Sequence, residues 1–415
     1  MDTLYDPKDP AFQADPYPRY ARMREASPVH FRTFVQPDGR ELPVWILPRW
    51  EDCVSLLRDP RFSAHKTFGE LLPAEPAGGE ELHPLARAYS GMMLFRDPPD
   101  HTRLRNLVNK AFTPRRVRRL RARVEALVAE LLDAAAAAGR MDVMADLAVP
   151  LPIIVIAELL GVPSADRERF KVWSDQAAML LDGSLRDEHL AVAVPSFLEL
   201  VDYLKGVVEA RRKEPADDLI SALVTARDAG DNLDDYEVLG TCALILGAGH
   251  ETTTNLIGNG LLALLRDRAA FERLGREPAL RPSAVEELLR YDSPVQVTSR
   301  IARQEVEIHG VRIPQGAEVN TLLGSANRDG AQFPDPDRLV LDRVDNRHLS
   351  FGHGAHFCLG APLARLEGEI AIGELARRFP RMALEVDEPP RRPGFVLRGC
   401  TRLPVALGAG AGRRA

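Results

Sequence analysis

Residues 351–360 read FGHGAHFCLG and run directly into an apolar segment predicted to be a helix over residues 361–379. The glycines of this loop leave room for the backbone to approach a flat group closely. Cys358 stands near the start of the predicted helix, where unpaired N–H groups and the positive end of the helix dipole favour a thiolate. A thiolate held by amide hydrogen bonds is a good axial ligand for haem iron, so we predict that Cys358 binds a haem.

Two other interpretations of this loop compete with a haem ligand. An isolated cysteine is most often an inert, buried small residue. Alternatively, His353, His356 and Cys358 are candidate zinc ligands, but a fourth ligand at ordinary spacing is missing. The remaining cysteines are scattered and form no CxxC pair, which argues against a disulfide framework: Cys53, Cys242 and Cys400.

A second segment, LILGAGHETTT at residues 244–254, places glycines and the acid–alcohol pair Glu251-Thr252 inside a long apolar stretch. The apolar pattern runs from Tyr236 to Leu265, roughly 45 Å of helix at about 1.5 Å per residue, which excludes the strand and turn of a dinucleotide-binding site. Glycine costs about 1 kcal/mol relative to alanine inside a helix, which indicates that the cluster has a function. The alternative is a polar kink in which threonine bonds the backbone carbonyl four residues earlier.

Periodicity elsewhere predicts the remaining elements. The pattern is mostly helical from His101 to about Arg290, and Asn232 and Asp235 are expected to cap the long apolar helix. After Pro294 the period becomes two, and residues 306–313 predict a hairpin. A short β element is expected over residues 44–47, and residues 62–96 are expected to form a long loop with at most short helices.

These segments together resemble the signature motifs of the cytochromes P450, and the resemblance extends over nearly the whole chain. Residues 351–360 match the cysteine-ligand pattern FxxGxxxCxG, residues 248–252 match (A/G)Gx(D/E)T, and residues 287–290 match ExxR, in the order of the family. The resemblance implies a mainly α fold with a smaller β-rich part, the cytochrome P450 fold. We expect one domain over residues 1–415, with a β-containing region at about 1–60, a helical core at about 101–290 and a mixed β and haem-loop region at about 291–415.

The same resemblance implies a haem b cofactor, iron protoporphyrin IX, with Cys358 as its proximal ligand. Phe351 is expected to pack beside the sulfur, in a loop whose Gly352 and Gly360 also belong to the haem site. The haem propionates are expected to contact four cationic residues: His101, Arg105, Arg300 and His356.

On the opposite side of the haem, Ala248 and Gly249 are expected to make room for dioxygen. Thr252 would supply a hydrogen bond during oxygen activation, and Glu251 would relay protons from solvent.

Glu287 and Arg290 lie on one helix face, an arrangement that alone indicates only a surface ion pair. The resemblance implies a buried, structural pair, joined by a later arginine. Either Arg343 or Arg338 suits this third position, and the sequence leaves the choice open.

Composition limits the partners and the location. The net charge of −6 argues against a nucleic acid partner. The longest apolar stretch, residues 147–162, is interrupted by Pro150, Pro152 and Glu158 and is too short for a membrane span. Since the first residues lack the features of a secretory signal, we expect a cytoplasmic protein, and we predict a monomer.

No flavin-binding segment is recognised in the 415 residues, so electrons are expected from another protein. The resemblance implies a ferredoxin and a ferredoxin reductase, with NAD(P)H acting only indirectly. Six arginines between Arg115 and Arg123 form either the wet face of an amphipathic helix or a docking site for an acidic electron donor.

The expected reaction is hydroxylation or epoxidation of an apolar, medium to large molecule such as a polyketide or macrolide, terpenoid, steroid or fatty acid. Alternatives are a P450-type enzyme that couples or rearranges its substrate and a haem-binding sensor without turnover, and the Glu251-Thr252 pair argues against both. The regions expected to line a roomy, hydrophobic pocket include Met92, Met93, Leu94, Met179, Leu180, Leu244, Ala248, Val295, Val297, Phe395 and Val396.

Overall fold

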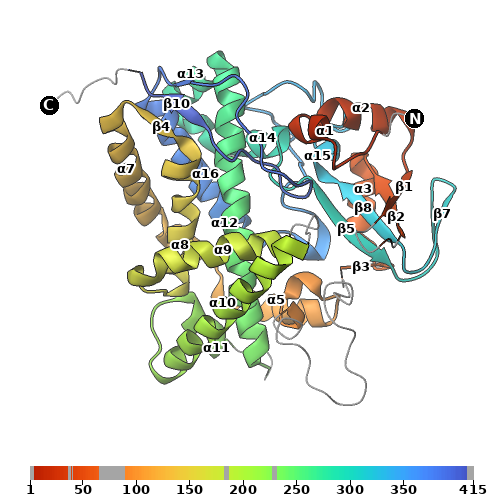
Figure 1. The fold of residues 1–415 in the computed structure, drawn as a ribbon, viewed down its shortest axis with the longest axis horizontal. Helices are drawn as coiled ribbons and strands as arrows, with labels where there is room; N and C mark the ends of the chain where they lie inside the picture. The colour runs from red at the N-terminus through yellow and green to blue at the C-terminus, as the bar shows by residue number, and fades with distance from the viewer. Residues whose placement is uncertain are drawn as a thin grey trace.

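The computed structural model describes residues 4–35, 39, 41–64, 89–181, 187–226 and 231–408, without the side chains of residues 164, 167, 174, 177–181 and 187–190. The chain is mainly helical with a smaller β part, as predicted, and in Figure 1 the main sheet and α7 (Arg121–Ala138) lie on opposite sides of α12 (Asp235–Arg266). Most of the predicted loop, residues 65–88, lies outside the described residues.

The α-helices of the described residues follow the chain in this order: α1 (Pro10–Ala14), α2 (Tyr17–Ala26), α3 (Trp50–Arg58), α5 (Asp100–Ala111), α6 (Pro114–Arg119), α7 (Arg121–Ala138), α8 (Pro150–Leu160), α9 (Arg167–Leu181), α10 (Asp187–Lys213), α11 (Leu219–Thr225), α12 (Asp235–Arg266), α13 (Arg268–Arg276), α14 (Arg281–Tyr291), α15 (Leu323–Ala326) and α16 (Ala361–Arg378). Short 3₁₀ turns include η2 (Met93–Phe95), η4 (Ser164–Asp166), η5 (Pro278–Leu280) and η6 (Gly354–His356), and η3 (Met144–Ala148) is a π-helix.

Helix α12 is the central element of the helical part, where it contacts α8, α9, α14 and α16. Its N-cap is Asp234, one residue from the predicted Asp235 and two from Asn232. The Asp234 carboxylate accepts from the N–H of Glu237 at 2.8 Å, and the Glu237 carboxylate accepts from the N–H of Asp234 at 2.9 Å. The prediction was wrong on the residue because α12 begins at Asp235, so that Asp234 is directly before the first helical residue, Asn232 lies too early and Asp235 is already inside the helix.

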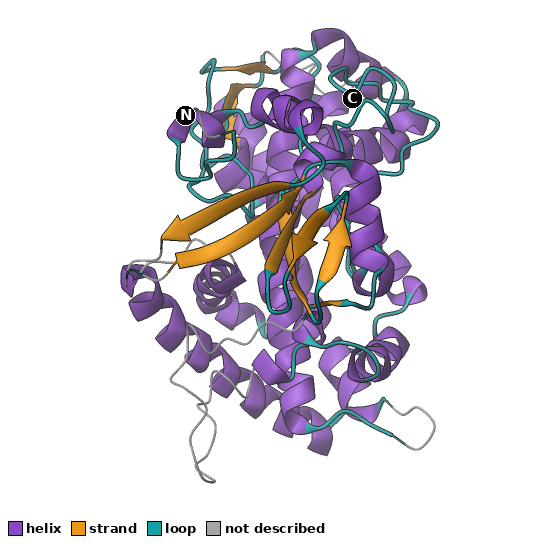
Figure 2. Ribbon diagram, turned by 90° about the vertical axis from the view of Figure 1, so that its right-hand side faces the viewer, coloured by secondary structure: helices purple, strands orange, loops and turns teal. Residues whose placement is uncertain are grey.

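The main sheet has five strands in the order β1-β2-β8-β5-β3, and Figure 2 shows it against the helices. Strands β2 and β8 pair in parallel, and the other neighbours are antiparallel. The predicted hairpin is confirmed as β6 and β7, with positive φ angles at His309 and Gly310 in its turn. The strands are β1 (His30–Val35), β2 (Glu41–Leu47), β3 (Phe62–Ser63), β4 (Arg140–Asp142), β5 (Val297–Ala302), β6 (Val306–Ile308), β7 (Val311–Ile313), β8 (Glu318–Leu322), β9 (Ala383–Leu384) and β10 (Pro404–Ala406).

Three apolar clusters form the interior. The largest surrounds α12 and joins the helices of the helical part, the second lies between the main sheet and α3, and the third packs α1 and α2 against the sheet. Among the residues that the structure describes, no helix combines the length and apolar character needed to cross a bilayer.

Candidate active site

The cysteine loop is built from turns that only glycine tolerates well. Gly352 and Gly354 have φ angles of 70° and 72°, and a Cβ at Gly354 would lie 2.7 Å from the Leu57 carbonyl oxygen. The N–H of Cys358 donates to the Phe351 carbonyl oxygen at 2.9 Å, which closes the loop. Gly360 is the N-cap of α16 in ordinary right-handed conformation. The loop thus places the sulfur at the beginning of α16.

Electrostatics around Cys358 differ from those around the other cysteines. Cys53, Cys242 and Cys400 are buried, whereas Cys358 retains exposed surface. Desolvation raises the pKa of the Cys358 thiol, and the backbone N–H groups of Gly360 and Ala361 act in the opposite direction, together with the charges of Arg105 and Arg365. Donors aimed at the sulfur stabilise a thiolate, the form that binds a metal.

Beside the sulfur lies what we call the cationic cluster, after its two arginines: Arg105 of α5 and Arg300 of β5, together with the imidazole rings of His101 of α5 and His356 of the loop. The rings of His101 and His356 are 4.1 Å apart between centroids. Burial and the neighbouring positive charges lower the pKa of His356 to about 3, and the pKa of His101 is lowered for the same reasons. The buried Nδ1 of His101 has no hydrogen-bond partner in the described structure.

These observations fit a haem. Asp97 is the carboxylate that attracts the cationic cluster, but it is already bonded to Ser63, the N–H of Ala64 and Arg303. Two propionates would supply the missing negative charge and an acceptor for His101, while Cys358 would supply the axial thiolate.

Behind the loop, Arg365 of α16 stacks on Phe351, with its guanidinium carbon 4.6 Å from the ring centroid. Its nitrogens donate to both oxygens of Glu286 at 2.7 and 2.8 Å. Desolvation opposes ionisation of Glu286, but the hydrogen bonds from Arg365 and His348 prevail and lower its pKa to about 2. Our sequence reasoning missed this support, although Arg365 lies seven residues after Cys358, on the same helix that the sulfur precedes.

Glu287 and Arg290 form a fully buried pair joined by two hydrogen bonds of 2.8 Å. Arg343 donates from Nε to the same carboxylate at 3.0 Å, and its side chain is 7% exposed. The Arg338 side chain is 76% exposed and faces Asp335, so that only its carbonyl oxygen reaches Arg290. The third member of the buried group is therefore Arg343.

On α12, Thr252 donates to the Ala248 carbonyl oxygen at 2.8 Å, the backbone bond considered from the sequence. Thr253 makes the same bond to Gly249 at 3.0 Å. A Cβ at Gly249 would lie 2.8 Å from Cδ1 of Ile156, so the close approach of α8 is one reason for glycine at this position.

Glu251 is buried and ionically paired with Arg392, which belongs to the segment between β9 and β10. Nδ2 of Asn255 donates to the same Glu251 oxygen at 3.3 Å. Our sequence reasoning missed Arg392, because nothing in the local pattern links it to a helix so far away in the chain.

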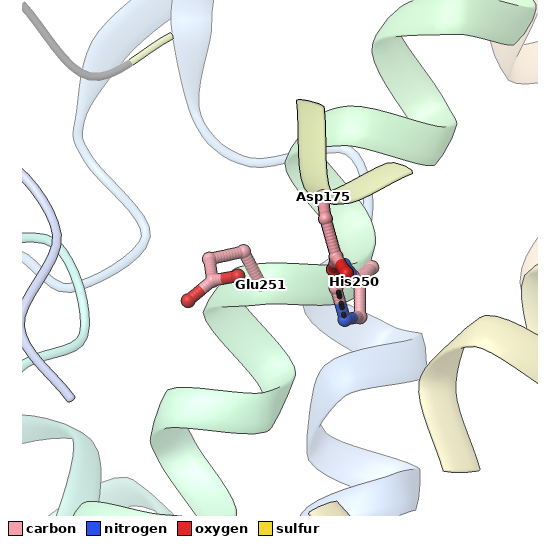
Figure 3. Close-up of side chains that lie close together, drawn as sticks. All are labelled: Asp175, His250 and Glu251. Carbon is pink, nitrogen blue, oxygen red and sulfur yellow. Dashed lines mark ion pairs between the residues drawn. The ribbon is translucent and has the colours of Figure 1, made fainter. Parts of the chain in front are cut away.

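Asp175, His250 and Glu251 each place a potential ligand atom within 4.8 Å of the others. Figure 3 shows Asp175 of α9 against His250, with a closest nitrogen–oxygen distance of 3.8 Å, and Glu251 directed to one side of them. Burial, Arg392 and Lys171 lower the pKa of His250 to about 3. Because the same positive charges would repel a divalent cation, we assign no metal ion to this cluster.

A family model described as Cytochrome P450 matches residues 83–401. The chain belongs to the cytochrome P450 family. Members of this family use haem and O2 with electrons from redox partners, so the chain is a P450 monooxygenase and an oxidoreductase, as predicted.

Three comparisons illustrate the similarity. This P450 is 43% identical over 401 residues to vitamin D(3) 25-hydroxylase of Pseudonocardia autotrophica, across 96% of this chain and 95% of that protein. It is 40% identical over 412 residues to 6-deoxyerythronolide B hydroxylase of Saccharopolyspora erythraea, across 98% and 100%. The crystal structure of P450BioI in complex with hexadec-9Z-enoic acid ligated acyl carrier protein superposes with a TM-score of 0.87 at 37% identity, across 95% of this chain and 98% of that chain.

The substrate-pocket candidates of the P450 fall into separate groups. Met92, Met93 and Leu244 are buried in the cluster around α12, and Ala248 packs against it. Val295 packs against the sheet cluster, whereas Val297 and Phe395 belong to the N-terminal cluster. The N–H of Gln296 donates to the Val396 carbonyl oxygen at 2.8 Å, so those two segments lie side by side. Leu94 is 37% exposed, and the side chains of Met179 and Leu180 on α9 lie outside the described residues.

The arginine run of the P450 spans α6 and the start of α7. Arg115 and Arg118 are exposed and have no ion-pair partner within the described ranges. The other four lie within 4.0 Å of a carboxylate: Arg116 and Arg119 of Asp217, Arg121 of Glu369, and Arg123 of Glu158. Most of the positive charge that the sequence offered for docking an electron donor is therefore paired with carboxylates of the same chain.

Proposed function

We propose that this P450 inserts one oxygen atom of O2 into a C–H bond or an alkene of an apolar, medium to large molecule. The other oxygen atom leaves as water, and each turnover consumes two electrons and two protons. One observation carries the proposal. Leu244, Ala248 and Thr252 follow one another at four-residue spacing, so that one face of α12 carries both apolar contacts and the hydroxyl that would pass a proton.

The haem, when bound, supplies the oxidising chemistry, while the protein supplies position, protons and water exclusion. The Thr252 hydroxyl holds its proton toward the Ala248 carbonyl and keeps its lone pairs for another donor. A hydroxyl passes a proton without itself ionising, and a carboxylate on the adjacent position, Glu251, can replace that proton from solvent.

The cationic cluster is proposed to bind the propionates, which would hold the macrocycle between Cys358 and α12. Phe351, Gly352 and Gly360 shape the loop on the thiolate side, and the small side chain of Ala248 is proposed to leave space on the other side, whereas Gly249 accommodates Ile156 of α8. In this proposal the cationic cluster binds the propionates, the cysteine loop supports the thiolate, and α12 forms the opposite side of the site.

Substrate breadth is suggested by the relatives, one named for vitamin D(3), one for 6-deoxyerythronolide B, and one solved with an acyl carrier protein bearing a fatty acid. Buried Met92 and Met93 add deformable apolar surface near α12, which suits large apolar ligands. We therefore propose a polyketide, terpenoid, steroid or fatty-acyl substrate, free or attached to a carrier.

Electrons are proposed to come from a ferredoxin reduced by a ferredoxin reductase, with NAD(P)H as the indirect source. Exposed Arg115 and Arg118 are the positive charges best placed to attract an acidic donor, because their four neighbours are already paired.

The test is a spectral titration of the haem-loaded enzyme against macrolides, terpenoids, steroids, free fatty acids and an acyl carrier protein loaded with a fatty acid. Binding should shift the Soret band as the iron-bound water leaves. Turnover of a positive compound under heavy-isotope dioxygen should give a product with one labelled oxygen atom. A product formed by coupling or rearrangement without labelled oxygen would overturn the proposal.

A further inference from the structure

We propose that Arg392 is a positioning residue for Glu251: it holds one oxygen of the carboxylate, leaves the other for proton transfer, and forms the solvent side of the proton route. The inference rests on the proposed role of Glu251 as a proton relay. The inference adds to that relay Arg392, a residue far from Glu251 in the chain, and the place where protons enter the route.

The contacts on Glu251 are unequal. Nη1 of Arg392 and Nδ2 of Asn255 both contact Oε1, whereas no side chain in the described part of the chain donates to Oε2. A carboxylate anchored through one oxygen keeps a fixed orientation while the other oxygen remains available to water. The asymmetry therefore suits a relay better than a purely structural ion pair, which would satisfy both oxygens, as Glu287 does.

The backbone around Arg392 is built for this approach to α12. The N–H of Arg392 donates to the Gly399 carbonyl oxygen at 3.1 Å. A Cβ at Gly399 would lie 1.8 Å from Oδ1 of Asn255, so only glycine lets this segment approach the side chain that also bonds Glu251. Arg392, Gly399 and Asn255 thus form one wall beside the carboxylate.

A surface pocket reaches the same wall. Arg392 and Gly399 line it, together with Gln296 and Tyr20 on its other sides. The Arg392 side chain is 20% exposed and lines this pocket, whereas the Glu251 side chain is 11% exposed and lies behind Arg392, outside the pocket lining. We place the entry of protons at this pocket, because Arg392 connects its lining to the Glu251 carboxylate.

Other charged groups around Glu251 do not replace Arg392. On α9, burial raises the pKa of Asp175, and the positive charges of Lys171 and Arg392 act against this rise. On α12, His250 has a pKa lowered to about 3 and is neutral near pH 7. Arg392 is thus the cation in ion-pair contact with Glu251 within the described structure.

The experiment compares R392Q, R392K and E251Q with R402Q, a control that removes an exposed arginine paired with Asp142. Haem-loaded proteins are studied first by infrared difference spectroscopy across a pH titration. We expect R392Q to add a protonated carboxylic acid signal near neutral pH to the signal that it shares with wild type and R402Q, that of Glu367, whose burial raises its pKa to about 8. The added signal should vanish in the R392Q/E251Q double variant. R392K should shift the titration of the same carboxylic acid signal in the same direction by a smaller amount. If R392Q does not fold, R392K replaces it in the comparison.

Coupling is then measured with a surrogate ferredoxin and ferredoxin reductase and the library compound that gives the largest spectral shift. We expect R392Q and E251Q each to release several-fold more peroxide per NAD(P)H, with R392K in between and R402Q unchanged. Uncoupling by E251Q with wild-type behaviour of R392Q would overturn this inference alone. Wild-type coupling in E251Q would overturn the proposed relay role as well, and an unchanged infrared titration in R392Q would refute the positioning.

Discussion

The buried group around Glu287 gives a quantitative prediction about stability. Glu287 and Arg290 are both 0% exposed, and the carboxylate also accepts from Arg343, from the N–H of Val340 and from Asn346. Glu287→Gln leaves Arg290 and Arg343 without a buried counter-charge. Breaking a buried pair in this way costs about 3–5 kcal/mol.

Arginine substitutions in the same segment provide a matched comparison. Arg343→Met removes charge-assisted bonds to Glu287 at 3.0 Å and to the Pro334 carbonyl oxygen at 2.7 Å, a loss of roughly 2–4 kcal/mol. Arg338→Met removes only an exposed pair with Asp335, so its effect should stay within about 0.5 kcal/mol.

The assay is thermal unfolding of the haem-loaded enzyme, followed by calorimetry and by loss of the Soret band. At about 1 °C per kcal/mol for a chain of 415 residues, Glu287→Gln should lower the melting temperature by roughly 3–6 °C. Equal destabilisation by Arg338→Met and Arg343→Met would refute the reasoning, and so would a Glu287→Gln variant as stable as wild type.

Further predictions concern the thiolate, the proton route and acid stability. Cys358→His should abolish the long-wavelength Soret band of the reduced carbonyl complex, and persistence of that band would mean that another residue ligates the iron. Thr252→Ala should increase peroxide release several-fold relative to Thr253→Ala, which loses an equivalent backbone bond; equal coupling in both would remove Thr252 from the proton route. Because the pKa of Glu286 is lowered from 4.5 to about 2, its contribution to stability is complete above pH 4.5 and is lost as the pH falls through about 2. Urea unfolding between these pH values should therefore show a weaker pH dependence in Arg365→Met, and an identical slope would contradict the assignment.

Local patterns in the sequence were sufficient to predict the main helices, the hairpin and the family. The glycine loop before Cys358, the long apolar period of α12 and the alternation at residues 306–313 each involve neighbours in the chain. Steric limits on φ and the helical period act over a few residues, so these features can be read without a tertiary structure. The sequence offered Asn232 and Asp235 as caps of α12, and only the backbone geometry selects Asp234, which lies between them.

Partners far apart in the chain required the fold. The sequence offered Arg338 and Arg343 equally, and the path of the loop places Arg343 beside Glu287 while Arg338 faces water. Arg392 meets Glu251 because Gly399 lets the C-terminal segment approach α12. Charge and residue type determine which side chains are able to pair, but burial and chain path decide which of them do, since an ion pair depends on distances that no local pattern encodes.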